Sequence, residues 1–154
     1  GQRRRAPALV LPGRHLRLHG AGAELDLLEA GAAAVAWDAV NFEEHNKTTR
    51  MGEAHWQVAE PVTLYGLALW WAADLVANVK LATGPLDPRT HWEQLYLPAL
   101  SPIALTPGQT CVARLRSTTS FERGTNVTWT LLVRDRAGRQ ITKQALDLEK
   151  GFLP

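Results

Sequence analysis

The fold class is decided by the stretch PVTLYGLALWW, residues 61–71, in which β-branched and aromatic residues follow a proline. Such residues favour the pleated, half-buried backbone of a β-strand. Outward from this stretch, turns marked by Pro and Gly separate further runs of the same kind, at residues 76–82, 92–97, 109–117, 126–133 and 140–148. The prolines at 98 and 102 are expected in a connection between strands. No βαβ rhythm is present, so we expect a mainly all-β fold, an antiparallel β-barrel or barrel-like sandwich.

The N-terminal part of the chain has a different character. Residues 1–22 mix Pro, Gly and Arg around the alternating string RHLRLH (14–19), which predicts a joint to an upstream domain and a first short strand. Residues 23–37 are rich in alanine and predict a short helical segment near the N-terminus. A polar loop is expected at 43–50, and the strand series from His55 onward. We therefore expect a single β-barrel domain over 23–154, joined to something upstream by 1–22.

Composition argues against several classes of protein. The formal net charge is only +2 and consecutive arginines occupy positions 3–5, so we expect no nucleic-acid partner. No stretch is long and apolar enough to span a membrane. The single cysteine, Cys111, excludes an intrachain disulfide, and its place in a predicted strand indicates a small buried hydrophobe. The Glu and His residues between 43 and 56 lack metal-ligand spacing, so we expect no metal, and we expect a cytoplasmic protein.

The segment most informative about chemistry is LATGPLDPRTHWEQ, residues 81–94. Its prolines favour extended and turn conformations, and it presents His91 and Trp92 directly before a predicted strand. An imidazole can relay a proton near neutral pH, and an indole face attracts a flat guanidinium cation. Together these side chains suit recognition of an arginine. The alternative interpretation is that His91 forms hydrogen bonds within the loop and Trp92 fills the core.

A resemblance to a known family bears on this choice. The strings TGP (83–85) and THW (90–92), with a proline between them and Gln94 after them, resemble the Thr-His-Trp loop of the protein arginine methyltransferases. The preceding run ends in Trp70-Trp71 and is similar to a strand that ends in an aromatic pair in that family. This pair, with QLYLP (94–98), is closest in character to the type III and tandem-repeat members. The likeness extends over about residues 62–148.

The resemblance implies roles for three residues. In that family the loop histidine pairs with an acidic residue of the other domain near the reacting guanidinium, which implies a catalytic role for His91. The loop tryptophan lines the arginine slot, so Trp92 would bind substrate. Thr90 would brace the loop as part of the same substrate site.

The resemblance also implies what this segment lacks. The family's glycines that bind S-adenosylmethionine, and the two glutamates that grip the guanidinium, lie in an upstream α/β methyltransferase domain, and they have no counterpart here. We therefore expect no cofactor on this segment, S-adenosylmethionine on the full-length protein, and no activity from the segment alone. The expected partners are that upstream domain and an arginine-containing protein or peptide. A homodimer through a helical arm is implied near residues 23–37. The alternative function is a non-catalytic protein-interaction or regulatory barrel.

Overall fold

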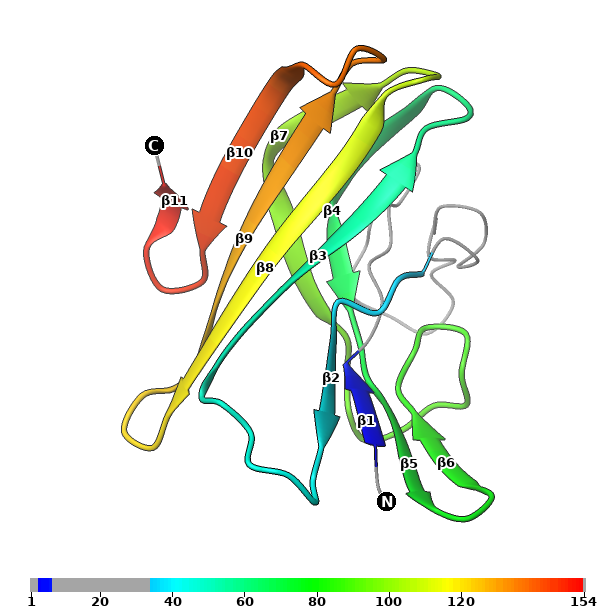
Figure 1. The fold of residues 1–154 in the computed structure, drawn as a ribbon, viewed down its shortest axis with the longest axis vertical. Helices are drawn as coiled ribbons and strands as arrows, with labels where there is room; N and C mark the ends of the chain where they lie inside the picture. The colour runs from blue at the N-terminus through cyan, green and yellow to red at the C-terminus, as the bar shows by residue number, and fades with distance from the viewer. Residues whose placement is uncertain (1–2, 7–33, 154) are drawn as a thin grey trace.

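The computed structural model describes residues 3–6 and 34–153, and within these ranges the fold is all-β (Figure 1). Every strand pairing is antiparallel. The strands form three sheets, with the orders β2-β1-β5-β6, β11-β10-β9-β8-β3 and β4-β7. No helix occurs in the described residues, so the predicted helical segment is wrong for residues 34–37, and the rest of it lies outside those described. The strand predicted at 14–19 also lies outside them.

The five-stranded sheet carries the larger part of the core. Its strands are β3 (Thr49–Gln57), β8 (Thr110–Ser120), β9 (Gly124–Arg134), β10 (Gln140–Asp147) and β11 (Gly151–Leu153). Successive side chains of a strand point to opposite faces, and one face of this sheet is apolar. The fully buried side chains on this face include Cys111, Ala113 and Leu131. This face needs a second layer to exclude water from it.

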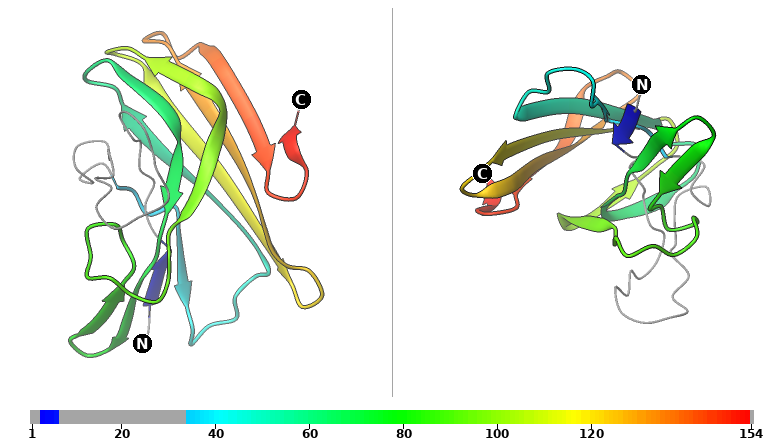
Figure 2. Two further views of the ribbon diagram at one scale, coloured as in Figure 1. Left: turned by 180° about the vertical axis from the view of Figure 1, so that it is seen from behind. Right: turned by 90° about the horizontal axis from the view of Figure 1, so that it is seen from below.

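The second layer is the pair β4 (Val62–Leu69) and β7 (Leu95–Leu105), which lies against the five-stranded sheet (Figure 2). Leu64, Leu67, Leu97 and Leu105 of this pair are almost completely buried and belong to the same core cluster as the inner residues of the large sheet. The layers do not close into a barrel in the described residues, because the sheets remain separate in their backbone pairing. The expectation of a mainly all-β, antiparallel fold is therefore confirmed, and a closed barrel is not formed.

Side chains take the place of backbone pairing where β7 passes β10. Gln144 of β10 is buried, and its Oε1 accepts hydrogen bonds from the backbone N of Leu100 at 2.7 Å and of Ser101 at 3.3 Å. Its Nε2 donates to the backbone O of Ser101 at 3.1 Å. Trp129 Nε1 of β9 donates to the O of Pro98 at 2.9 Å. These contacts satisfy backbone groups that would be costly to bury unpaired.

The prediction that the prolines at 98 and 102 lie in a connection was wrong, since both lie within β7. Proline cannot donate a ladder hydrogen bond, so it is confined to strands with a free edge. In the described residues β7 pairs through its backbone with β4 alone, which leaves it such an edge. A long strand can therefore include both prolines.

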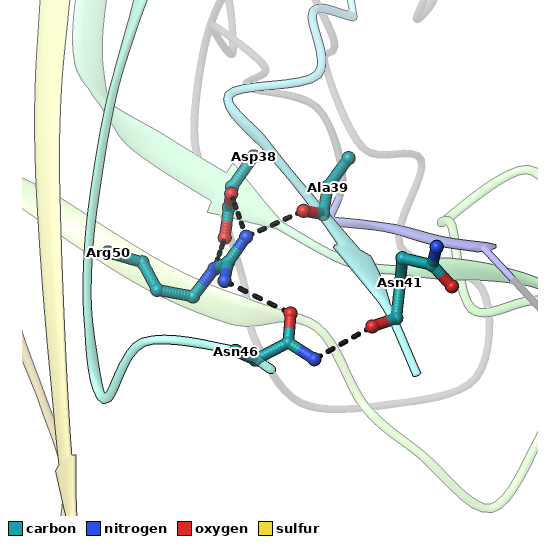
Figure 3. Close-up of polar contacts among 5 residues, drawn as sticks. All are labelled: Asp38, Ala39, Asn41, Asn46 and Arg50. Atoms are coloured by element: carbon teal, nitrogen blue, oxygen red, sulfur yellow. Dashed lines mark hydrogen bonds and ion pairs between the residues drawn. The ribbon is translucent and has the colours of Figure 1, made fainter. Parts of the chain in front are cut away.

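The third sheet contains β2 (Asp38–Asn41), β1 (Arg3–Ala6), β5 (Ala72–Val76) and β6 (Val79–Ala82). Arg50 of β3 connects it to the sandwich (Figure 3). The Arg50 guanidinium donates through Nε and Nη2 to the two carboxylate oxygens of Asp38, and Nη2 also donates to the O of Ala39 at 2.6 Å. Asn46 extends the network by donating to the O of Asn41 at 2.8 Å. The hydrogen bond with Asp38 is the main cause that raises the pKa of Arg50, so the guanidinium keeps its charge.

Candidate functional site

The loop of residues 83–94 connects β6 to β7 and carries the three residues predicted to act on a substrate. It lies toward the end of the molecule where the β5–β6 hairpin projects (Figure 1). The loop begins where the chain leaves the third sheet and ends where it enters the second layer of the sandwich. Its shape therefore depends on how its two ends are held.

Thr83 holds the start of the loop against the strand junction at Trp71. Its side chain is buried, and Thr83 Oγ1 both accepts from the Trp71 N and donates to the Trp71 O, each at 3.1 Å. The Thr83 N donates to the same Trp71 O at 2.9 Å. Gln94, at the other end of the loop, donates through Nε2 to the Thr83 O at 2.7 Å. The two ends of the loop and Trp71 are thus joined at one residue.

Close packing at Gly84 fixes the next turn. A Cβ at this buried position would lie 2.5 Å from Asp87 Oδ2 and 2.9 Å from Trp70 Nε1, so only glycine fits without movement of these groups. The Gly84 N donates to Asp87 Oδ2 at 2.9 Å, and the Asp87 N donates to the Gly84 O at 3.1 Å. The sequence Thr-Gly-Pro therefore encodes a close approach of the loop to Trp70.

Thr90, His91 and Trp92 lie together at the outer part of the loop. Thr90 Oγ1 accepts from the Trp92 N at 3.2 Å and donates to the Trp92 O at 3.1 Å, which braces this turn. Trp92 is 49% exposed, and its indole meets Trp71 edge to face, with ring centroids 5.3 Å apart. The exposed His91 ring lies 6.0 Å from the Trp92 ring. The alternative in which Trp92 fills the core is wrong, while the roles of all three residues stay predictions.

The side chains exposed at this surface are an indole and an imidazole. An exposed indole beside an imidazole offers a π face and a titratable hydrogen-bonding group to a planar guanidinium. An open pocket of about 630 Å³ lies elsewhere, and its lining includes Phe42, Asp74 and Lys80 but none of the three loop residues. His91 and Trp92 therefore lie outside that pocket, on the exposed surface of the loop.

Sequence reasoning assigned no role to Trp71, Thr83, Asp87 or Gln94, although all four shape the loop. Gln94 and the Thr-Gly-Pro string were part of the resemblance, so a signal was present. The contacts of Trp71, Thr83 and Gln94 join residues 11 and 12 positions apart, as Gln94 with Thr83 and Trp71 with Thr83. A local pattern does not reveal such contacts.

Other candidate groups lie outside this loop. Cys111 is fully buried, and burial raises the pKa of its thiol to about 12, which confirms the expectation of an inert hydrophobe. On the exposed face of the large sheet, Arg114 Nε donates to Glu53 at 2.5 Å and His55 lies 3.0 Å from the same carboxylate. The hydrogen bond from Arg114, and after it the one with His55, lowers the pKa of Glu53. Among the described residues there is no cluster of His, Cys, Asp and Glu fit for a metal, nor a helix able to cross a membrane.

Comparisons with known proteins find similarities to arginine methyltransferases. No model of a protein family matches the chain. A segment of 49 residues is 35% identical to the arginine N(omega)-methyltransferase of Streptomyces achromogenes subsp. streptozoticus, and it covers 32% of this chain and 14% of that protein. The fold is similar to a chain of the Trypanosoma brucei PRMT1 enzyme-prozyme heterotetrameric complex with AdoHcy, with a TM-score of 0.61 and 14% identity.

The extent of these matches limits what they show. The structural match covers 93% of this chain but 55% of the trypanosome chain, so this chain spans about half the length of that relative. Identity at this level shows a shared fold alone. Neither match favours the type III or tandem-repeat members over the rest of the family.

Proposed function

We propose that this chain is the substrate-binding half of an S-adenosylmethionine-dependent protein arginine N-methyltransferase. The observation that carries the proposal is the exposed Trp92 indole beside His91, on a loop that hydrogen bonds hold in shape. The fold similarity to the trypanosome enzyme complex and the 49-residue segment that is 35% identical to the Streptomyces methyltransferase support it.

Each loop residue has a distinct task in this proposal. Trp92 provides one wall of the slot for the substrate guanidinium through cation–π attraction and stacking. His91 pairs with a carboxylate of the donor-binding domain beside the reacting nitrogen. Thr90 braces the turn through its two hydrogen bonds with the Trp92 backbone. From the Trp70-Trp71 pair we also propose that the enzyme is a type III or tandem-repeat member of the family.

The methyl donor belongs to another domain. Donor binding at a dinucleotide-type site needs a glycine-rich turn before a helix, and the described residues contain no helix. Methyl transfer depends mainly on holding the donor in line with the attacking nitrogen, so the chain by itself should be inactive. Its partners are the upstream α/β domain, an arginine-containing protein or peptide, and a second copy in a homodimer. We propose a cytoplasmic location for the assembled enzyme.

Binding of an arginine peptide to the chain tests the substrate role. Loss of the cation–π contact in Trp92→Ala should weaken binding roughly threefold to thirtyfold. Phe152→Ala is a matched control, because Phe152 is also 49% exposed but lies on β11, away from the loop (Figure 1). A peptide with citrulline for arginine tests whether the charge is recognised.

Equal and negligible binding by the wild type and Trp92→Ala would leave the isolated half-site without a substrate role. Activity is then measured with the full-length protein, radiolabelled S-adenosylmethionine and the arginine peptide. Peptide binding without methyl transfer would favour the non-catalytic interaction module. Methyl transfer that His91→Ala and Trp92→Ala leave unchanged would remove these residues from the mechanism, and mass analysis of the product separates mono- from dimethylarginine.

A further inference from the structure

We infer that Thr83 and Gln94 are positioning residues for Trp92. Together they form what we call the loop clasp, the pair of side chains that ties both ends of the 83–94 loop to Trp71. They act through Trp71, whose ring supports Trp92. The inference rests on the proposed function only where it concerns the arginine substrate.

Every polar group of Thr83 forms a hydrogen bond within the clasp. Its N and its hydroxyl both donate to the Trp71 O, and its hydroxyl also accepts from the Trp71 N. Its own O accepts from Gln94. Thr83 is 1% exposed, and the only other polar or charged residues of the described chain that are similarly buried are Gln144 and Asp147. A buried hydroxyl with this many partners fixes the backbone geometry on both sides of it.

Trp71 links the clasp to the exposed Trp92 indole. Trp71 is the residue whose backbone Thr83 holds, and its ring contacts Trp92 edge to face at 70° between the ring planes. Edge-to-face pairs have a preferred geometry, so a shift of Trp71 moves the support of Trp92. Gln94 fixes the other end, two residues after Trp92. The orientation of the exposed indole is thus set by two neutral polar side chains at the base of the loop.

The Trp71–Trp92 pair provides a readout that does not depend on a substrate. Two indoles in close contact produce an exciton couplet in circular dichroism, and the spectrum of the wild type minus that of Trp92→Phe isolates it. Thr83→Val removes the hydroxyl with little change of volume, while Thr83→Ser retains it. Gln94→Leu removes the donor to the Thr83 O. Gln57→Leu is its matched control, because Gln57 is also exposed but lies on β3 and contacts Thr110.

We expect Thr83→Val and Gln94→Leu to diminish the couplet, and Thr83→Ser and Gln57→Leu to preserve it. Loss of one hydrogen bond at the clasp should also weaken arginine-peptide binding roughly fivefold in the same two variants. Gln94 is exposed, so Gln94→Leu is expected to fold and decides the question should Thr83→Val unfold. Thermal unfolding of each variant separates loss of fold from loss of geometry.

Two outcomes would overturn the inference. One is an unchanged couplet in Gln94→Leu and in a folded Thr83→Val. The other is equal loss of the couplet in Thr83→Ser or Gln57→Leu, which would indicate general destabilisation. A couplet that responds as expected, in a full-length protein that neither binds nor methylates the arginine peptide, would retain the clasp and reject the proposed function.

Discussion

The inner face of the five-stranded sheet and the 83–94 loop are held by opposite kinds of interaction. Side chains such as Leu131 and Leu115 fill the sheet interior with exposed fractions of 0% and 2%. The loop exposes Leu86 to 72%, and its shape comes from hydrogen bonds of Thr83, Asp87 and Gln94. Apolar burial is non-directional, whereas hydrogen bonds specify angles.

This difference shows how the molecule separates stability from geometry. The free energy of folding comes mainly from apolar area removed from water, which the sandwich supplies. A hydrogen bond contributes less net free energy, because folding exchanges it for one with water. The loop therefore adds little to stability but places Trp92 and His91. Substitutions in the two regions should consequently affect different measurements.

The largest expected effect is that of Leu131→Ala on stability. Leu131 lies on the central strand β9 with no exposed surface, so its truncation leaves a cavity and should lower the free energy of unfolding by about 3 kcal/mol. Leu86→Ala removes the same atoms from the loop surface and should change it by less than about 0.5 kcal/mol. Equilibrium unfolding in urea measures both. Equal losses would show that the loop shares the apolar character of the sheet.

A smaller change in stability, with a clear change in geometry, is expected for Gly84→Ala. The new Cβ would collide with Asp87 Oδ2 and Trp70 Nε1, which should break the Gly84–Asp87 hydrogen bond and cost about 1 kcal/mol. Gly138→Ala is the matched control. Its φ of +79° disfavours alanine by about 1 kcal/mol, but open space surrounds its Cβ position.

Urea unfolding and the Trp71–Trp92 couplet separate these two glycine variants. Both should lose similar stability, and only Gly84→Ala should alter the couplet. A normal couplet in Gly84→Ala would mean that the loop tolerates movement at its base, and the contrast between the two regions would weaken.

The sequence predicts the strands whose apolar runs are bounded by turn residues. β8, β9 and β10 were expected at 109–117, 126–133 and 140–148, close to their observed bounds. The first part of β3 was missed, because its inward positions hold the small residues Gly52 and Ala54 in place of large apolar ones. Gly52 is required since a Cβ there would lie 1.9 Å from the Trp37 O, a contact that no local pattern contains.

The candidate site shows the same limit. The position of His91 and Trp92 on a loop before a strand followed from prolines and from the resemblance. The sequence did not predict the free edge of β7. Gln144 bonds the backbone of β7, and this role is apparent only when β7 lies beside β10 in the fold. The clasp residues were also missed, since their partners are distant in the sequence. Local patterns therefore predicted elements, and tertiary contacts decided closure and geometry.

The smallest expected effect tests a polar anchor at the end of the large sheet, Asp147. Burial alone would raise the pKa of this carboxyl, but hydrogen bonds from Asn126, from the backbone of Lys150 and Glu149 and from Thr128 outweigh it and lower the pKa. A carboxyl whose pKa is lower in the folded state contributes stability above its unfolded value, near 3.9, and loses it as the pH falls through the folded value.

Acid should therefore reduce the urea midpoint of the wild type below about pH 4 more steeply than that of Asp147→Asn, which has no titratable group at this position. Above that pH the variant should be the less stable of the two, because the amide cannot accept all the hydrogen bonds that converge on the carboxylate. Parallel profiles for the two proteins would contradict this account. They would also show that the sheet, unlike the loop, depends on no polar contact at its β10–β11 end.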